Sequence, residues 1–244
     1  MNSLAIQNLS HSYFINGVEA VIFNGLTFEI RPGEITAIMG ESGAGKTTFG
    51  KILGGALEVQ KGSVIWPPEC SEERQRLYWP QDPMNVISMH RTVYGNLEWP
   101  LKQLGISSTA RRSKIESVLK AVMLEKHSSH LPKNLSGGQV SRLALAIMLI
   151  TEPRAVVLDE ALDGLDEATK SNIIKVLSKR ASDSDLLTIF IAHNPNEVLK
   201  LADRCLILSR DDSAKIVRDV KIDLSRPRDD KSNAYHELLS EIRA

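Results

Sequence analysis

Three short runs of apolar residues stand out along the chain. They are Ile35–Met39, Ala155–Leu158 and Leu186–Ala192. Continuous apolar runs of this length are typical of strands that are buried on both faces of a parallel sheet. Helical spacing over Thr47–Leu53 and Lys170–Arg180 alternates with these runs. Strands that alternate with helices predict an α/β core around a parallel sheet.

The two ends of the chain carry shorter patterns. Near the N-terminus, Asn-Gly and Arg-Pro-Gly turn signals separate three expected strands, Leu4–Asn8, Val21–Phe23 and Phe28–Ile30, which predict a small antiparallel β subdomain. Near the C-terminus, an alternating strand is expected with one face formed by Ile216, Val220, Ile222 and Leu224. A short helix is expected over the last residues, Ala234–Ala244.

The middle of the chain has a helical period instead. Ser113–Leu124 predicts a one-sided amphipathic helix, whose apolar face would hold Ile115, Val118, Leu119, Val122 and Met123. A second apolar helical run covers Leu143–Ile150. We therefore expect a single domain in which a helical subdomain, residues 83–150, is inserted into an α/β core formed by residues 1–82 and 151–244.

Composition narrows the class of protein. Of the 244 residues, 42% are hydrophobic and 25% are charged, which is ordinary for a globular protein and excludes a disordered one. The 30 Lys and Arg residues balance 30 Asp and Glu residues, so a strongly cationic surface for nucleic acid is not indicated.

The sequence also carries expectations about location. No apolar run approaches the ~20 residues of a membrane-spanning helix, and the start of the chain lacks the features of a secretory signal. Two cysteines, Cys70 and Cys205, indicate neither a disulfide framework nor a zinc site, and we expect both to be reduced and half-buried. Together these features predict a reduced, cytosolic, soluble protein.

A glycine-rich motif follows the first buried strand and precedes a helix. It fits the pattern G-x-x-x-x-G-K-[ST], and its residues are Gly40, Glu41, Ser42, Gly43, Ala44, Gly45, Lys46, Thr47 and Thr48. Glycines let backbone N–H groups surround phosphate oxygens, and the helix N-terminus adds a positive potential. Lys46 would neutralise the β- and γ-phosphates, and the Thr47 hydroxyl would bind Mg²⁺. The motif predicts a nucleotide-phosphate site.

Two carboxylates, Asp159 and Glu160, end the apolar run that starts at Ala155. Ligands of parallel sheets bind beyond the carboxyl ends of the strands, so both carboxylates are expected beside the phosphates. One of the two, Asp159 or Glu160, would hold Mg²⁺, directly or through water. The adjacent carboxylate would polarise the attacking water.

A second anion site is predicted in the helical region. Ser136 and Gln139 have capping-box spacing ahead of the apolar run that begins at Leu143, so Ser136 should open that helix. The Ser136 hydroxyl, the amides of Gly137 and Gly138 and the helix dipole would then attract an anion.

On these motifs the sequence resembles the nucleotide-binding subunit of ATP-binding-cassette (ABC) transporters, over nearly its whole length. The family's motifs occur in the family's order: the phosphate loop 40–48, the glutamine Gln81, the signature LSGGQ at 135–139, the acidic strand end at Asp159 and Glu160, the D-loop ending at Asp166, and the histidine His193. Tyr13 stands where the family has an aromatic ring that stacks on adenine. The resemblance implies a P-loop NTPase core of the RecA type.

The resemblance also implies a mechanism with two copies of the chain. Each ATP would be held between the phosphate loop of one copy and the LSGGQ residues Ser136, Gly137, Gly138 and Gln139 of the other. Lys46, Thr47 and Gln81 would organise the phosphates and Mg²⁺. Glu160 is the expected general base, and His193 would contact the γ-phosphate. Asp166 would couple the two sites across the dimer.

Some positions depart from the family pattern. Ala161 stands where proline usually follows the glutamate, Asp163 alters the D-loop, and Ser141 replaces the glutamine before Arg142. None of these changes removes a catalytic group, so a competent ATPase is expected, with its rate and its D-loop coupling left open.

No long insertion separates the phosphate loop from the signature, which disfavours the DNA-repair and chromosome-condensation relatives of the family. Two features favour an importer. The lead-in 130–134 resembles that of importers, and the tail 221–228, which with Val220 reads VKIDLSRPR, resembles that of the nitrate/sulfonate/taurine importer ATPases. The expected partners are a membrane permease, which would hold the chain at the inner face of the cell membrane, and a solute-binding protein. The surface segment 82–105, with Trp79 just before it and Trp99 near its end, is where the family receives the permease. The alternatives are a soluble ABC ATPase of the iron–sulfur assembly type, an exporter ATPase, and a subunit that uses ATP only to hold a dimer together.

Overall fold

The computed structural model describes residues 2–72, 75–80, 82–162, 167–184, 186–209, 213–226 and 228–243. The chain forms two compact units. The sheet unit comprises residues 1–78, 154–160 and 176–244, and the helical unit comprises residues 79–153 and 161–175. Within the described ranges, no helix is both long and apolar enough to cross a bilayer.

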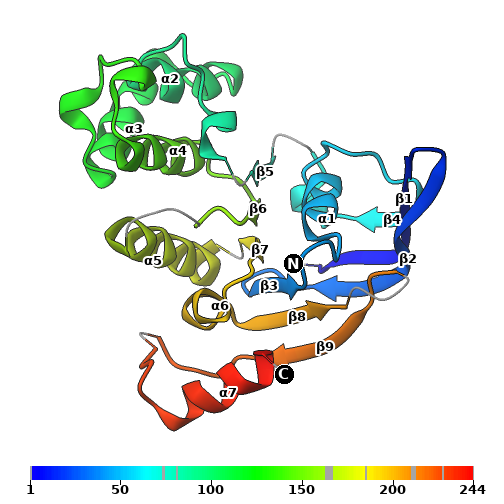
Figure 1. Ribbon diagram of the computed structural model, residues 1–244. Helices are drawn as coiled ribbons and strands as arrows, with labels where there is room; N and C mark the ends of the chain where they lie inside the picture. Colours follow the sequence, from blue (N-terminus) through cyan, green and yellow to red (C-terminus); the bar gives the residue numbers. More distant parts are fainter. Residues whose placement is uncertain are drawn as a thin grey trace. The chain divides into compact units, whose positions relative to one another are not determined.

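A six-stranded sheet forms the centre of the sheet unit (Figure 1). Its strands, in spatial order, are β5 (Arg76–Trp79), β6 (Ala155–Asp159), β7 (Leu187–Ile191), β3 (Ile35–Gly40), β8 (Arg204–Leu208) and β9 (Ile216–Lys221). Strands β6, β7, β3 and β8 are parallel, and β9 pairs with β8 in the antiparallel direction. Every residue of β6 and β7 is buried, as the continuous apolar runs predicted.

A three-stranded antiparallel sheet, in the order β2 (Val18–Ile30), β1 (Leu4–Ile15) and β4 (Lys61–Ile65), belongs to the same unit. The three short N-terminal strands that the sequence predicted are parts of two long ones. Asn16 and Gly17 form the hairpin turn, with φ values of 52° and 81°, as a two-residue type I′ turn requires. Gly25, with φ 74°, lies inside β2, where its N–H donates to the Ser10 hydroxyl. The second Asn-Gly signal therefore marks an irregularity within a strand.

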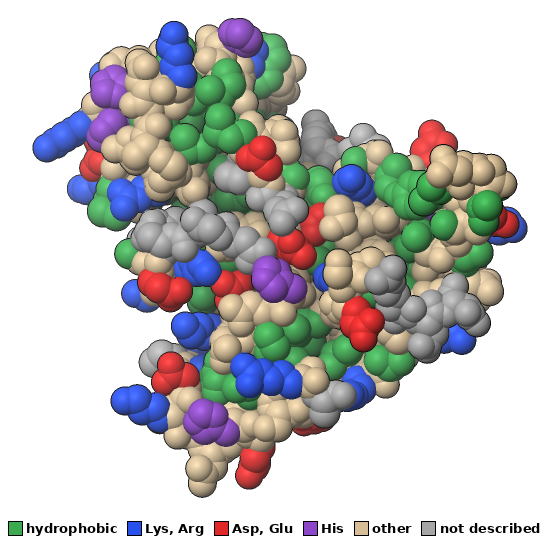
Figure 2. All heavy atoms as spheres, in the orientation of Figure 1, with side chains coloured by type: hydrophobic (Ala, Val, Ile, Leu, Met, Phe, Trp, Pro, Cys, Tyr) green, Lys and Arg blue, Asp and Glu red, His purple; other side chains and the backbone are tan. Residues whose placement is uncertain are grey.

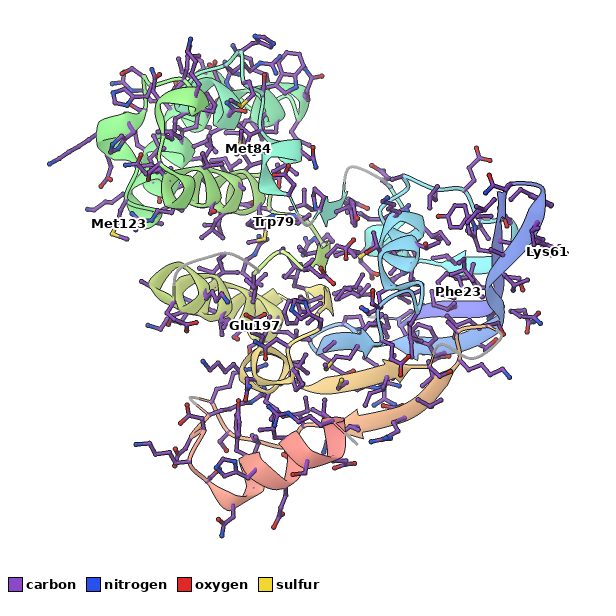
Figure 3. All side chains as sticks on the ribbon, in the orientation of Figure 1. Phe23, Lys61, Trp79, Met84, Met123 and Glu197 are labelled. Carbon is purple, nitrogen blue, oxygen red and sulfur yellow. The ribbon has the colours of Figure 1, made fainter. Side chains whose placement is uncertain are left out.

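The core of the sheet unit joins the two sheets. Phe23 on β2 is fully buried (Figure 3), its ring lies edge-on to that of Phe49 at 6.2 Å, and its backbone forms a bridge to Ala214. Phe49 lies on α1 (Lys46–Leu53). The unit also holds η1 (Pro68–Cys70), α6 (Pro195–Leu201), α7 (Asn233–Arg243) and the C-terminal part of α5 (Glu167–Ser184). Both cysteines are free and fully buried, more deeply than expected.

The helical unit packs three helices together, α2 (Val93–Gln103), α3 (Ser108–Ala121) and α4 (Gly137–Thr151). The 3₁₀ turn η3 (Pro83–Val86) precedes α2, and two further turns, η4 (Glu125–His127) and η5 (Pro132–Asn134), lie between α3 and α4. Trp79 is 1% exposed, whereas Trp99 is 47% exposed under the guanidinium of Arg91.

The boundaries predicted for the amphipathic helix were wrong. Helix α3 starts five residues earlier than predicted because the Ser107 hydroxyl caps it, and it ends at Ala121. Met123, which was assigned to the apolar face, has φ 56° and is 53% exposed (Figure 3). A residue with positive φ cannot continue a right-handed helix, so the turn at Met123 directs its side chain outward, while Val122 and Leu124 are buried.

Surface charge follows the balanced composition. On the face shown in Figure 2, basic and acidic side chains are interspersed.

Two arginines of the tail, Arg226 and Arg228, form hydrogen bonds within the sheet unit. Arg228, whose side chain is 1% exposed, donates to the carbonyls of Leu199 and Ala202, both at 2.6 Å, and pairs with Asp203. Burial lowers the pKa of Arg228 to about 10. The tail thus satisfies carbonyls that α6 leaves free at its C-terminus.

We predict that Arg228→Met lowers the free energy of unfolding by about 3 kcal/mol, because it leaves buried carbonyls without a donor. Urea denaturation followed by circular dichroism measures this change. Arg226→Met is the matched control: Arg226 also binds an α6 carbonyl, that of Leu201, but its side chain is 30% exposed. The control should cost less than half as much, and equal costs would contradict the role of burial.

Candidate functional site

The register of the parallel strands brings three carboxyl ends to one edge of the sheet. Asp159 on β6 pairs with Ile191 on β7, and Ile191 pairs with Ile38 on β3. The segments that follow these strands therefore emerge next to one another. They are the glycine-rich loop after β3, Glu160 after β6 and His193 after β7.

The glycine-rich loop is shaped by Gly45. This residue has φ 82°, and a Cβ at this position would lie 2.5 Å from Ile22 Cγ2 and 2.8 Å from Phe23 Cε1. Only glycine satisfies both the left-handed backbone and the close approach. Gly45 is also the N-cap of α1 and has no side chain with which to cap the helix. The first N–H groups of α1 thus remain available to an anion.

Lys46 folds back over this loop. Its Nζ donates to the carbonyls of Gly40 and Glu41 at 2.8 and 3.0 Å, and the residue is only 8% exposed. Burial lowers the pKa of Lys46, while Glu160 and Asp159 raise it. The ammonium group is therefore held at the loop and close to two carboxylates.

Asp159 is 1% exposed and is bound by two hydroxyl groups. Thr47 Oγ1 lies 3.4 Å from Oδ1, and the Tyr78 hydroxyl donates to Oδ2 at 2.8 Å. Burial raises the pKa of Asp159, and the hydrogen bonds from Tyr78 and Thr47 lower it. Burial and the same hydrogen bond raise the pKa of Tyr78, so its hydroxyl stays a donor. Tyr78 was not predicted as a site residue, since a tyrosine in a short strand carries no motif.

Glu160 and His193 lie close together, next to the glycine-rich loop. His193 Nδ1 lies 3.9 Å from Glu160 Oε1. Glu160 has φ 50°, and its N–H donates to the carbonyl of Ile191 at 2.9 Å. The turn after β6 thus anchors the backbone of Glu160 to the strand that leads to His193.

The glycine-rich loop, Lys46, Glu160 and His193 line one cavity of about 520 Å³. This volume is typical of small-molecule sites. Its lining is Ile22, Gly40, Ser42, Gly43, Gly45, Lys46, Thr47, Thr48, Glu160 and His193. Tyr13 lies beside the loop, with its hydroxyl 3.3 Å from Thr48 Oγ1 and its ring edge-on to His11. Ile22 was not predicted as a site residue, and a lone apolar residue on a strand gives no signal for that role.

The signature residues lie in the helical unit, at the start of α4. The predicted capping box is confirmed: Gln139 N–H donates to Ser136 Oγ at 3.4 Å, and Ser136 N–H donates to Gln139 Oε1 at 2.9 Å. The Gln139 amide nitrogen also lies 3.1 Å from His127 Nε2, which must then act as the acceptor. A Cβ at Gly137 would meet nothing within 4 Å, and Gly138 follows it in the first turn.

Two predicted site residues, Gln81 and Asp166, lie outside the described residues, as does Asp163. The other predicted residues divide between the units. Lys46, Thr47, Asp159, Glu160 and His193 come together in the sheet unit, and residues 136–139 belong to the helical unit.

Comparison with known proteins identifies the family. The family model described as "ABC transporter" matches residues 23–163. The chain belongs to the ABC transporter family. The methionine import ATP-binding protein MetN of Xanthomonas axonopodis pv. citri is 30% identical over 222 residues, which cover 88% of this chain and 65% of MetN. The energy-coupling factor transporter ATP-binding protein EcfA1 of Mycoplasmopsis synoviae is 33% identical over 194 residues, 77% of this chain and 72% of EcfA1. The chain thus spans slightly less than two thirds of the MetN proteins that it matches.

Solved structures confirm the predicted fold class. A dimeric bacterial ABC transporter cassette superposes with a TM-score of 0.77 at 24% identity, over 90% of this chain and 98% of that one. A structure described as the ATP binding subunit of an ABC transporter gives a TM-score of 0.79 at 19% identity, with both chains fully covered. The fold is therefore an ABC cassette: a P-loop NTPase core with an antiparallel β subdomain and an inserted helical subdomain.

We predict that Gly45→Ala lowers the free energy of unfolding by about 3 kcal/mol, from the left-handed backbone and the collision with Ile22 and Phe23 together. Gly17→Ala is the matched control, since Gly17 has φ 81° and open space around it. The control should cost about 1 kcal/mol. Urea unfolding of both variants measures the difference, and equal costs would show that Ile22 and Phe23 give way.

Proposed function

We propose that this chain is the ATP-binding and ATP-hydrolysing subunit of an ABC transporter that imports a small solute. The observation that carries this proposal is a cavity lined together by the glycine-rich loop, Lys46, Glu160 and His193. Asp159 lies next to this cavity, with its Oδ1 3.4 Å from Thr47 Oγ1. A loop shaped for phosphate and a pair of carboxylates are the parts that nucleoside-triphosphate hydrolysis needs.

The residues that line the cavity fit a nucleoside triphosphate. The uncapped first turn of α1 and the loop amides offer donors to phosphate oxygens. The ammonium group of Lys46 donates hydrogen bonds to the carbonyls of Gly40 and Glu41. The β- and γ-phosphate oxygens of a bound nucleotide would be stronger acceptors for it, because they are charged. Tyr13, next to Thr48 at the edge of the loop, would stack on the adenine ring.

The residues also fit Mg²⁺, provided that phosphate completes its coordination. Thr47 Oγ1 and Asp159 Oδ1 are oxygen ligands 3.4 Å apart. Among the residues that the structure describes, no group of three or more His, Cys, Asp or Glu side chains could hold a metal by itself. Protein sites for Mg²⁺ commonly supply one or two oxygen ligands and leave the rest to water and substrate phosphates. When bound, Mg²⁺ would neutralise charge on the β- and γ-phosphates, and Gln81 would assist Thr47 and Asp159 in holding it.

Hydrolysis would use Glu160 and His193. Glu160 would accept a proton from a water molecule as the water oxygen attacks the γ-phosphorus and the bond to ADP breaks. His193, 3.9 Å from Glu160, would donate a hydrogen bond to the γ-phosphate. Lys46 would neutralise negative charge on the transferred group.

A second copy of the chain would complete the site. Ser136, Gly137, Gly138 and Gln139 form an open helix N-terminus in the helical unit, and such an end attracts phosphate. In the proposed dimer this end contacts the nucleotide of the other copy, with Asp166 linking the two sites. A structural relative that was solved as a dimer supports the association of two copies.

The importer assignment rests on the relatives. MetN is a methionine importer protein, and a further relative, CysA of Pseudomonas syringae pv. tomato, is a sulfate/thiosulfate importer protein at 29% identity over 85% of this chain. The tail sequence favours the nitrate/sulfonate/taurine type within this group. The proposed partners are a membrane permease, which would hold the chain at the inner face of the membrane, and a solute-binding protein. Co-purification in mild detergent with a polytopic membrane protein tests this part.

We predict that Glu160→Gln lowers the steady-state rate of ATP hydrolysis 100-fold or more, because a general base contributes a factor of about 10²–10⁴ to the rate. ATP binding should be retained. Phosphate release and size-exclusion chromatography with ATP measure the two effects, and a stable ATP-bound dimer is expected. Glu152→Gln is the matched control, because Glu152 also has a positive φ, 47°, but lies at the end of α4. Hydrolysis by Glu160→Gln at the wild-type rate would show that Glu160 is not the base.

We predict that Ser136→Arg abolishes ATP-dependent dimerisation and hydrolysis but leaves the affinity of the monomer for ATP within about twofold, a factor that corresponds to less than 0.5 kcal/mol. The reason is that Ser136 would act on the other copy's nucleotide. Ser107→Arg is the control, since Ser107 caps α3 in the same unit. Loss of monomer binding in Ser136→Arg alone would contradict the proposal.

A further inference from the structure

The two oxygens of the buried Asp159 carboxylate have different partners. Oδ1 faces the Thr47 hydroxyl at 3.4 Å, and Oδ2 accepts the shorter hydrogen bond, 2.8 Å, from the Tyr78 hydroxyl. Thr47 belongs to the phosphate loop, whereas Tyr78 comes from β5 and belongs to no motif. Two hydroxyl groups from different elements fix both the position and the rotation of one carboxylate.

Two glycines, one within α1 and one at its C-cap, provide the place for the Tyr78 ring. A Cβ at Gly54 would lie 2.6 Å from both Cβ and Cγ of Tyr78. A Cβ at Gly50 would lie 3.3 Å from Tyr78 Cε2 and 3.6 Å from Asp159 Oδ2. Gly50 and Gly54 are one helical turn apart and lie on the same face of α1. The ring therefore packs along a face that lacks side chains, and its hydroxyl reaches the carboxylate beyond.

Neither glycine is required by its own backbone. Gly54 has φ −76°, which any residue adopts without strain, and Gly50 lies inside α1, where glycine is unfavourable relative to alanine. The space occupied by Tyr78 and Ile191 accounts for both glycines.

We propose that Tyr78 is a positioning residue for the metal site: by holding Oδ2 of Asp159, it keeps Oδ1 directed at Thr47, where Mg²⁺ would bind with the nucleotide. This inference rests on the proposed function. Tyr78 touches neither metal nor nucleotide and acts through Asp159. A hydrogen bond to a carboxylate in a buried site is worth more than one between neutral groups, so its removal changes the energy of the metal-bound form.

The test compares nucleotide affinity with and without metal. Isothermal titration calorimetry with a non-hydrolysable ATP analogue, in Mg²⁺ and in EDTA, gives two dissociation constants whose ratio measures the coupling between metal and nucleotide. In Tyr78→Phe we expect this ratio to fall about tenfold, the effect of losing one hydrogen bond to a charged group, while the affinity in EDTA stays within about twofold of wild type. A tyrosine that only packs against α1 would lower both affinities together, and an unchanged ratio would overturn the inference.

Tyr235→Phe is the matched control. Tyr235 is also buried in the sheet unit, and its hydroxyl donates to the carbonyl of Asn196 at 3.3 Å. This variant loses one buried hydroxyl without touching Asp159, so its ratio should equal that of wild type. A fall as large as that in Tyr78→Phe would assign the effect to general destabilisation and overturn the inference.

Gly54→Ala tests the glycine face without removing the hydroxyl. The new methyl group displaces the ring of Tyr78, so the ratio should fall as it does in Tyr78→Phe. The double variant Gly54→Ala with Tyr78→Phe should show no further fall, since both changes remove the same interaction. Additive falls in the ratio would show that Gly54 does not act through the position of the Tyr78 ring.

The same experiment separates this inference from the proposed function. A wild-type chain that binds the analogue no better in Mg²⁺ than in EDTA would overturn the proposed magnesium site and the inference with it. A wild-type chain with metal-dependent binding, together with an unchanged ratio in Tyr78→Phe, would overturn the inference alone.

Discussion

The buried charge of Asp159 is the constraint on which the sheet unit depends. Strand β6 is covered on both faces, so the carboxylate at its end is removed from water, which costs free energy unless hydrogen bonds and opposite charge compensate. The chain meets this need with Thr47 from the phosphate loop, Tyr78 from β5 and the nearby ammonium groups of Lys46 and Lys51. The glycines along α1 follow from the same need, because they let Tyr78 approach.

Two helix N-termini, one in each unit, are built in opposite ways. Helix α1 starts at Gly45, which leaves its first N–H groups without a side-chain acceptor. Helix α4 starts at Ser136, whose hydroxyl and the Gln139 side chain already satisfy two donors, while the glycines keep the approach open. The first end is suited to surround a phosphate group, and the second is suited to contact one from a single side.

How much the sequence predicted depends on burial and on local chemistry. Strands β3, β6 and β7 were found because strands buried on both faces read as apolar runs, and the cap at Ser136 was found because capping is local. Strand β4, with the sequence KGSVI, gave no signal because it is short, mostly polar and paired on one edge. The end of α3 was misplaced because Met123 continues the apolar pattern although its backbone has left the helix. Tyr78 and His127 were missed because each matters only through a partner far along the chain or in another element, which no spacing rule records.

Two arginines of the tail and Tyr235 of α7 hold α6 at both ends. Arg226 and Arg228 bind carbonyls at its C-terminus, and the Tyr235 hydroxyl binds the carbonyl of Asn196 near its start, three residues after His193. These contacts thus stabilise the segment that follows His193, the proposed γ-phosphate contact. A genetic screen for inactive variants would accordingly recover substitutions of Arg226 and Arg228 alongside those in the motifs. A fusion partner attached after α7 would need a linker long enough to leave these contacts undisturbed.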